Sequence, residues 1–257
     1  HTVIDKHIKL YRQCGFKFLI SNFCNLREDA KQELIKYPGL YSIMEHDHKY
    51  LRSRDPSIFK DFVAPPNQII NRVFYANAKA IFAQSKLHKE VIEKNLKLNN
   101  IISLGMNLWT DEQLAIIEKN VENEKKDDFS IVNSTNPTKN TQACVSYCVE
   151  KNLDYTLVGS PDYDEFIEQL SLHARYLYFP KVLETFNRVI IEARMLNCTV
   201  ITTQNNGCLS EDWFAKYRGK ELIEFVREQR QRVYKDIKNA IFCLLYTSPS
   251  PRDGLLS

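Results

Sequence analysis

Two carboxylates in the second half of the chain lie on either side of the expected start of a helix. Glu184 and Glu192 are separated by seven residues, and Asn187 stands between them. A carboxylate accepts hydrogen bonds from sugar hydroxyl groups, and Asn187 can cap a helix. The start of that helix would direct free N–H groups and a positive dipole end at an anion. We therefore expect a seat for an anion beside two acceptors for hydroxyl groups.

Alternating strands and helices must position these residues. The predicted strands are 129–133, 154–158, 175–179 and 199–202. The predicted helices are 140–151, 163–171, 188–197 and 210–242, the last with Ser210 as its cap. Such alternation is typical of a parallel, doubly wound sheet, which binds ligands beyond the carboxyl ends of its strands. Glu184 then lies in a loop after one strand, and Glu192 lies inside the following helix.

The first half of the chain has a similar pattern. We expect strands at 16–20, 40–44, 79–84 and 101–104, helices at 2–12, 26–37, 68–77, 85–95 and 110–126, and a loop with a short helix at 49–66. His46, Asp47 and His48 follow the second of these strands, where an open α/β sheet places its chemistry. A metal site would need a third ligand that the pattern lacks. We therefore favour a substrate-facing role, with plain hydrogen bonding as the alternative.

Two blocks of this sequence resemble signatures of the group 1 (family 4) retaining glycosyltransferases. One is Phe179-Pro180 followed by the Glu184/Glu192 pair, and the other is the segment 77–104, in which Ser85 opens a helix. The resemblance covers about residues 40–207. It implies an α/β fold of GT-B type, with two Rossmann-like doubly wound parallel-sheet domains, the first of them incomplete in this chain.

The resemblance also implies a reaction and a set of roles. The reaction is transfer of a hexose-type sugar from a nucleotide-diphosphate sugar to an acceptor hydroxyl, with retention, without a metal and without a separate cofactor. The acceptor would be a carbohydrate or a lipid-linked molecule. The implied residues are Glu184, His46 and Lys139 for catalysis, Glu192, Phe186, Asn187, Arg188 and Gly159 for donor binding, and Asp47 and His48 on the acceptor side.

This chain departs from the family pattern at several places. Gly105–Leu108 does not keep the usual Asn-Gly-Val-Asp order. Thr185-Phe186-Asn187 stands where the family usually has Gly-Phe-Gly, and the loop at 134–140 keeps Lys139 but lacks the family's arginine. Arg188 is a candidate replacement charge. An arginine at the start of a helix opposes the helix dipole unless an anion binds there.

Three other functions stay open at this stage. They are a nucleotide-sugar epimerase of the same fold, a non-catalytic nucleotide-sugar-binding protein, and a GT-A transferase that uses Asp162 and Asp164. The two aspartates also fit the first turn of a helix, which we prefer because the dipole favours acids there.

Composition limits the classes further. The net charge of +3 is too small to indicate nucleic-acid binding, and no run of 18 or more apolar residues predicts a membrane span. The seven scattered cysteines are typical of a reducing cytosol, so we expect a cytoplasmic protein. The lysine-rich side of the helix at 85–95 suggests peripheral membrane contact, but interspersed glutamates favour a solvated face.

The domain organisation follows from these patterns. We expect a partial N-terminal, acceptor-side domain at 1–109, a connecting helix and linker at 110–128, a C-terminal donor-binding domain at 129–242 and a non-native tail at 243–257. The tail contains CLLYTSPSPRD, which matches a translated sequencing adapter. We therefore expect a fragment at both ends.

Overall fold

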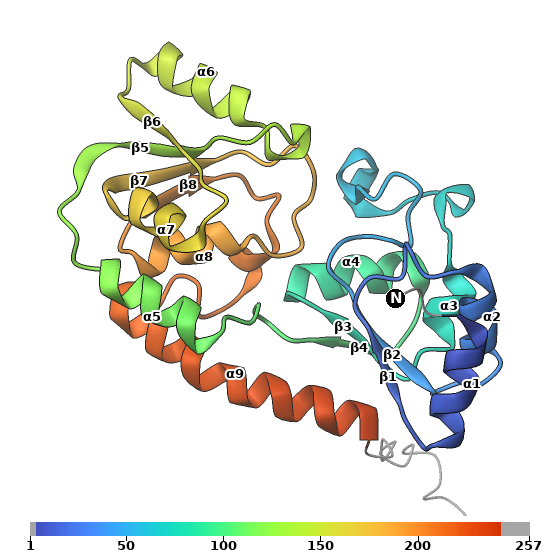
Figure 1. Cartoon of the computed structure of the whole chain (residues 1–257). Coiled ribbons are helices and arrows are strands. Elements are labelled where there is room, and N and C mark those ends of the chain that lie inside the picture. Colours follow the sequence, from blue (N-terminus) through green and yellow to red (C-terminus); the bar gives the residue numbers. More distant parts are fainter. Residues whose placement is uncertain (1–3, 243–257) are drawn as a thin grey trace, which may run out of the picture.

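The structure is a computed structural model that describes residues 4–242. Two four-stranded parallel sheets lie side by side, each flanked by helices (Figure 1). The expected tail at 243–257 lies outside the described residues. Within residues 4–242, no helix is both long and apolar enough to cross a membrane. The α/β class with two parallel sheets confirms the predicted fold class.

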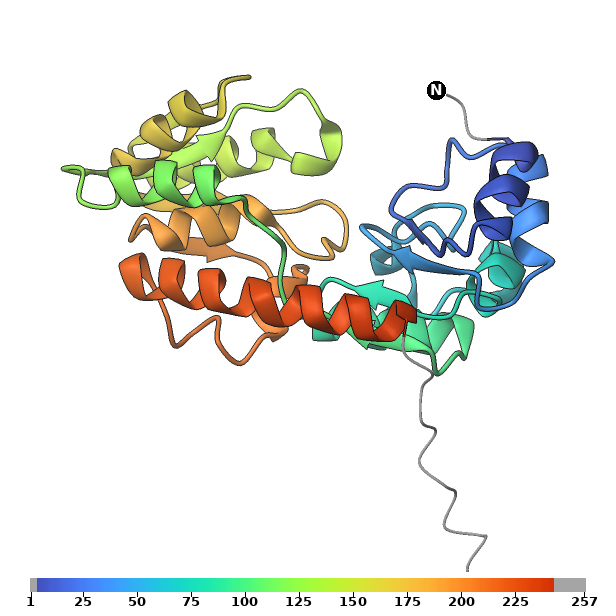
Figure 2. The same cartoon turned by 60° about the horizontal axis from the view of Figure 1, so that its bottom comes forward.

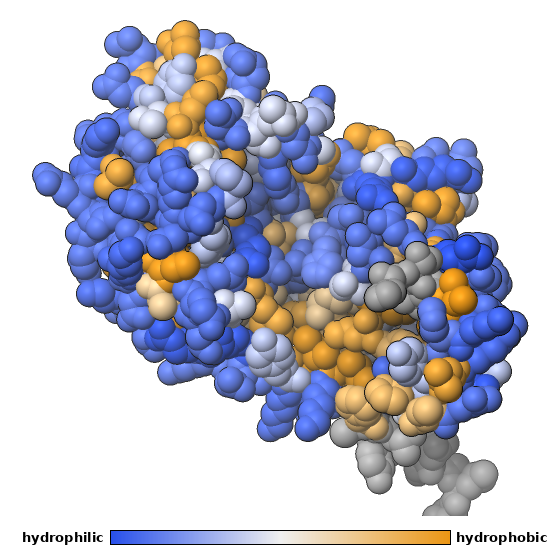
Figure 3. Space-filling view, viewed as in Figure 1, coloured by the Kyte–Doolittle hydropathy of each residue, from blue (hydrophilic) through white to orange (hydrophobic). Residues whose placement is uncertain are grey.

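The N-terminal sheet has the strand order β1-β2-β3-β4. Its strands are β1 (Phe18–Ile20), β2 (Tyr41–Met44), β3 (Ile81–Ala83) and β4 (Ile101–Ser103), and its helices are α1 (Asp5–Gln13), α2 (Glu28–Ile35), α3 (Arg72–Ala76) and α4 (Lys86–Leu96). Ile43 and Ile81 are fully buried on the two central strands. Figure 3 shows hydrophobic residues gathered over the region of these strands. Because β2 and β3 are covered by neighbours, they read as apolar runs in the sequence.

The C-terminal sheet has the strand order β6-β5-β7-β8. Its strands are β5 (Lys126–Val132), β6 (Tyr155–Val158), β7 (His173–Tyr178) and β8 (Thr199–Thr202), and its helices are α5 (Asp111–Asn120), α6 (Thr141–Lys151), α7 (Tyr163–Ser171) and α8 (Arg188–Met195). The chain moves from β5 to β6 on one side and then returns to β7 on the other. That reversal makes the sheet doubly wound and places a crevice at the carboxyl ends of β5 and β7.

The predicted helix over 110–126 is too long. Helix α5 ends at Asn120, and Lys126 already begins β5. The charged run at 122–128 resembles a helix end, but its last residues belong to β5. The final acid of this run, Asp128, is held by partners on the neighbouring strands. Asp128 accepts a hydrogen bond from Thr156 Oγ1 at 3.0 Å and lies 2.6 Å from His173 Nδ1.

The predicted helix over 210–242 is wrong in its first part. Helix α9 runs over Gly219–Phe242, and Ser210 does not cap it. Instead, Ser210 Oγ accepts from Leu87 N at 3.0 Å and Glu211 Oε1 accepts from Lys86 N at 2.7 Å. The two side chains thus satisfy the free N–H groups at the start of α4 in the other half of the molecule.

Helix α9 connects the two halves. Figure 2 shows it running along both of them. The guanidinium of Arg230 donates to Trp109 O at 3.0 Å, and that of Arg232 donates to Leu104 O at 2.9 Å. One hydrophobic core joins Phe82 of β3 to the buried residues of α8 and α9. Burial of this shared apolar surface holds the two sheets together.

The two halves also pack closely at Gly207. Ser85 Oγ donates to Thr185 O at 2.8 Å beside this glycine. An added Cβ at Gly207 would overlap both Thr185 O and Ser85 Oγ. The missing side chain is therefore what lets the turn after β8 fit between the two halves.

We predict that Gly207→Ala lowers the free energy of unfolding by about 1–3 kcal/mol, because a tightly packed contact must shift to admit the methyl group. Gly159→Ala is the control, since a Cβ there would lie 3.4 Å from its nearest neighbour, Asn133 O. Urea denaturation measures both variants. Equal stabilities would show that the contact between the halves is looser than described.

Candidate functional site

A cavity of about 460 Å³ lies between the two halves, with walls from both. It is lined by His46, Asp47, Ser53, Arg54, Asn136, Thr138, Lys139, Val182, Leu183, Glu184 and Thr185. Four of the predicted site residues, His46, Asp47, Lys139 and Glu184, thus meet at one cavity. They come from segments that are far apart in the sequence and follow β2, β5 and β7.

Glu184 is the centre of the C-terminal wall. Its Oε1 lies 2.8 Å from Lys139 Nζ, and the same oxygen accepts a hydrogen bond from Tyr178 OH. Its backbone is fixed to the turn after β8, because Glu184 N donates to Asn205 O at 3.1 Å and Glu184 O accepts from Gly207 N at 2.8 Å. The carboxylate therefore has a defined place at the end of β7.

Lys139 ends a short turn, Pro137–Lys139, directly after β5. Asn136 begins this turn, and its side chain accepts from Thr138 N at 3.0 Å. Lys181 N donates to Thr138 O at 3.2 Å, which ties the turn to the loop that carries Glu184. The side chain of Lys139 is 36% exposed, so a ligand in the cavity can reach it.

His46 faces this pair from the N-terminal half. Gln84 Nε2 lies 3.3 Å from His46 Nδ1, and the Thr185 hydroxyl lies 2.8 Å from His46 O. Burial, reinforced by the charge of Lys49, lowers the pKa of His46. The imidazole is therefore neutral at pH 7, and because the Gln84 amide donates to Nδ1, its Nε2 carries the hydrogen and can donate to a ligand.

A buried polar network supports the His46–Asp47 segment from behind. Glu45 and Lys49 form a buried ion pair at 2.7 Å, and Glu45 Oε1 accepts from Asp47 N at 3.1 Å. His48 is fully buried, with its Nδ1 2.9 Å from Tyr50 OH, and does not line the cavity. Its predicted acceptor-side role stays a prediction, and in this position it would act through its neighbours.

Glu192 is buried away from the cavity. Its Oε1 accepts from Trp109 Nε1 and from Tyr163 OH, both at 2.9 Å. Arg188 lies 3.6 Å from the same oxygen and over the Trp109 ring, 4.8 Å from its centroid. The unusual arginine at a helix start is thus explained by an acid one turn later and an aromatic face.

Phe186 and Asn187 are both buried. Asn187 Oδ1 accepts from Ile190 N at 3.1 Å, which confirms Asn187 as the cap of α8. Phe186 packs against Trp213, with the ring centroids 6.2 Å apart. The lining of the cavity ends at Thr185, so the anion seat at the start of α8 and the donor-binding roles of both residues stay predictions.

Gly159 lines a second, smaller cavity of about 360 Å³ at the carboxyl ends of β5 and β6. Asp162 Oδ1 accepts from Glu165 N at 2.9 Å and so caps α7. Asp164 lies 3.8 Å from Lys119 Nζ. These contacts agree with the preferred interpretation of the two aspartates as helix-start acids. Within residues 4–242, no group of three or more His, Cys, Asp or Glu side chains is placed to hold a metal ion.

The sequence did not single out Arg54, Gln84, Thr185 or Tyr178 for this site. Tyr178 is the last residue of β7 and Gln84 directly follows β3, and that position was an available signal. Thr185 stands where a glycine was expected; its hydroxyl donates to His46 O or to Gln84 Oε1, which lies 2.6 Å away. Arg54 gave no signal, because its loop has no periodic pattern.

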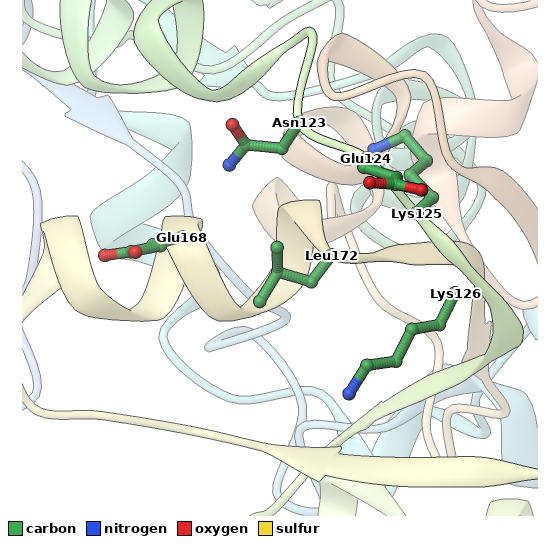
Figure 4. Close-up of a pocket in the computed structure, with 6 residues that line it drawn as sticks. All are labelled: Asn123, Glu124, Lys125, Lys126, Glu168 and Leu172. Atoms are coloured by element: carbon green, nitrogen blue, oxygen red, sulfur yellow. The ribbon is translucent and has the colours of Figure 1, made fainter.

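A larger cavity of about 690 Å³ lies at the opposite edge of the C-terminal sheet. Figure 4 shows its lining side chains: Asn123, Glu124, Lys125, Lys126, Glu168 and Leu172. They surround the amino ends of β5 and β7. Lys125 Nζ already donates to Ser171 O at 2.5 Å. Because ligands of parallel sheets bind at the carboxyl ends of strands, we assign no function to this cavity.

Comparisons with known proteins identify the fold. No family model matches this chain, and no significant match was found among curated proteins. A UDP-forming trehalose-phosphate synthase from Burkholderia xenovorans shares 8% identity, with a TM-score of 0.52 over 92% of this chain and 72% of that one. The pneumococcal O-GlcNAc transferase GtfA in complex with UDP and GlcNAc shares 9% identity, with a TM-score of 0.51.

The alignment with GtfA covers 91% of this chain but only 58% of GtfA. OtsA in its apo form shares 9% identity, with a TM-score of 0.50 over 89% of this chain and 72% of that one. These solved structures are GT-B glycosyltransferases. At such low identity the likeness shows the fold alone, and the fold of this chain is that of GT-B glycosyltransferases.

We predict that Glu192→Ala lowers the free energy of unfolding by about 2–5 kcal/mol, because the Trp109 and Tyr163 donors lose their buried acceptor. Glu192→Gln keeps Oε1 and should cost less than half as much. Urea denaturation of both variants measures the difference. If alanine is tolerated as well as glutamine, the carboxylate does not hold these donors.

Stability should also fall in mild acid because of His48. Burial lowers the pKa of His48 to about 3, whereas an unfolded chain protonates a histidine near 6.5. Below pH 6.5 the unfolded state therefore binds one more proton at His48 than the folded state does. Through this group alone, the free energy of unfolding falls by up to about 1.4 kcal/mol per pH unit until pH 3.

The test compares unfolding free energies at pH 7 and pH 5. His48→Phe should reduce the loss on acidification, whereas His7→Gln, a change at an exposed histidine of α1, should leave it unchanged. An identical loss in wild type and His48→Phe would contradict the assignment.

Proposed function

We propose that this protein is a glycosyltransferase that moves a hexose-type sugar from a nucleotide-diphosphate sugar to an acceptor hydroxyl, with retention and without a metal. The observation that carries the proposal is the Lys139–Glu184 pair at 2.8 Å, on the wall of a cavity that His46 and Asp47 face from the other half. The GT-B fold supports the proposal. Two solved structures with this fold support it as well, since one is a transferase in complex with UDP and the other is a UDP-forming synthase.

Lys139 would stabilise the leaving group. The diphosphate gathers negative charge as the bond to the sugar breaks, and a cation already in place lowers the energy of that state. The ammonium group is partly exposed and held by a single carboxylate, so it can turn toward a phosphate oxygen. A protein cation of this kind can stabilise the charge of the leaving group as a metal ion does in other transferases.

Glu184 would bind and orient the donor sugar. Its carboxylate is held by Lys139 and Tyr178 on one oxygen, Oε1, so the other oxygen can accept from sugar hydroxyls. Holding the sugar in one orientation relative to the acceptor lowers the entropic part of the activation barrier. The backbone contacts of Glu184 to the turn after β8 give this orientation its rigidity.

His46 and Asp47 would meet the acceptor. Because Gln84 Nε2 donates to His46 Nδ1, the neutral imidazole carries its hydrogen on Nε2 and can donate it to a hydroxyl oxygen of the acceptor, and the Asp47 carboxylate can accept from a second hydroxyl. The acceptor would be a carbohydrate or a lipid-linked molecule, and the reaction would belong to carbohydrate biosynthesis in the cytoplasm. Both residues sit across the cavity from Glu184, which is the arrangement that transfer requires.

The nucleotide would extend toward Gly159 and Glu192. Gly159 lines the small cavity at the ends of β5 and β6, where a base could stack. Glu192 would accept from ribose hydroxyls, and these would replace Tyr163 OH, which now occupies Oε1. The assignment of Glu192 therefore includes a movement of Tyr163 on binding.

A non-catalytic nucleotide-sugar-binding protein is the second candidate. Thr185 stands in place of a glycine, and its hydroxyl is held by the other half of the molecule. Such a lock could slow the opening that turnover needs. Binding of a nucleotide sugar without product, in the presence of varied acceptors, would support this candidate over the transferase.

The first test is a thermal-shift screen against UDP-, GDP- and ADP-sugars. A ligand at 100 times its dissociation constant stabilises the folded state by about 2.7 kcal/mol, so the correct base should raise the Tm by several degrees. The failure of every nucleotide sugar to shift the Tm would contradict the proposal.

Two variants then test the roles. Lys139→Ala should weaken binding of the selected nucleotide sugar about 10- to 100-fold, since it removes a charge-assisted contact. Glu184→Gln should lower turnover about 100-fold or more. Lys181→Ala is the control, because Lys181 is exposed on the loop that carries Glu184 and does not line the cavity. Calorimetry and product analysis give both readouts, and unchanged values for Lys139→Ala would contradict the role of that lysine.

A further inference from the structure

The charges on the cavity wall do not favour a diphosphate as long as Lys139 acts alone. Lys139 is paired with Glu184 at 2.8 Å, so this pair carries no net charge. Asp47 adds a negative charge on the opposite wall, and the low pKa of His46 leaves that ring neutral. A diphosphate bound here needs a second cation to offset these acids.

Arg54 is the remaining cation on the cavity wall. We infer that Arg54, from the N-terminal half, supplies the second cation that grips the diphosphate of the donor. This inference rests on the proposed function. It fills the gap left in the loop at 134–140, where the arginine of related enzymes is missing.

The loop of Arg54 is fixed against the donor-side wall. The neighbouring Asp55 accepts through Oδ1 from Ser57 N at 2.9 Å, from Ser57 Oγ at 2.6 Å and from Leu183 N at 3.2 Å. Leu183 immediately precedes Glu184. The hydrogen bond from Leu183 to Asp55 therefore sets Arg54 at a defined position relative to the Lys139–Glu184 pair.

The backbone of Arg54 is held in an unfavourable conformation. Its φ of +54° lies in the left-handed region, which a residue with a side chain rarely adopts. Strain of this kind persists where surrounding contacts enforce it, and it gathers at binding sites. The Ser53–Asp55–Ser57 hydrogen bonds supply that enforcement.

The guanidinium of Arg54 is also available to a ligand. Its side chain is 53% exposed, and its ion pair with Asp47 is long, at 3.9 Å. Its other contact is Cys24 Sγ, a weak acceptor. A planar guanidinium binds two phosphate oxygens at once, so a diphosphate would readily replace both present partners.

Arg188, the other candidate for the missing arginine, is already committed. Its guanidinium lies over the Trp109 ring, 3.2 Å from Gln113 Oε1 and 3.6 Å from Glu192 Oε1. It does not line the cavity with Lys139. Arg54 therefore takes the role that the sequence pattern had suggested for Arg188.

The test uses Arg54→Gln in the described chain, with Arg52→Gln as the matched control. Arg52 lies on the same loop, is exposed, and donates to Asn67 O without lining the cavity. Calorimetry measures the affinity for three ligands. They are the nucleoside diphosphate of the nucleotide sugar that raises the Tm most in the thermal-shift screen, the matching nucleoside monophosphate, and inorganic pyrophosphate.

Arg54→Gln should weaken binding of the diphosphate and of pyrophosphate about 10- to 100-fold and change binding of the monophosphate by less than about 3-fold. Arg54→Lys should fall between wild type and Arg54→Gln, because it keeps the charge but not the paired donors. Arg52→Gln should match wild type. The Tm of each ligand-free variant shows that the fold is retained.

Two outcomes would overturn the inference. If wild type binds the nucleoside diphosphate and Arg54→Gln binds it equally well, Arg54 has no part in the site, although the proposed function stands. If wild type binds no nucleotide or nucleotide sugar at all, the proposed function fails and the inference falls with it.

Discussion

The hydrogen bonds at Thr185 are the constraint on which the rest of this structure depends. Thr185 O accepts from Ser85 at 2.8 Å, and its hydroxyl lies 2.8 Å from His46 O. A residue of the C-terminal half thereby fixes both the start of α4 and the segment after β2. The cavity has walls from two sheets because this contact, together with the close fit at Gly207, holds the sheets at one separation. A looser contact would leave two half-sites facing solvent.

Much of the fold follows from local patterns. The strands were predicted within three residues of their observed ends, since buried parallel strands read as short apolar runs between turn signals. The prediction that Lys139 and Glu184 belong to one site came from the family resemblance, and the strand pattern agrees with it. Each follows a strand of one parallel sheet, and such strands end at a common edge. The structure places their charged groups 2.8 Å apart.

What the sequence could not predict depends on contacts between distant segments. Ser210 and Glu211 resemble the start of their own helix but cap α4 instead, because the start of α4 lies beside them in space. Glu192 looks like an exposed ligand-binding acid, yet its acceptor oxygen is occupied by Trp109 and Tyr163. Arg54 lies in a loop without periodicity, and a hydrogen bond from Leu183 to the adjacent residue holds this loop at the cavity.

The central claim is that a nucleotide sugar binds between the two halves, with its diphosphate at Lys139 and its sugar at Glu184. A crystal structure of the protein with the nucleoside diphosphate that stabilises it most would test this claim directly. The account predicts phosphate oxygens within about 3 Å of Lys139 Nζ, which is hydrogen-bond distance. A nucleotide bound elsewhere, such as beside Lys125 and Lys126 at the opposite edge of the sheet, would contradict it.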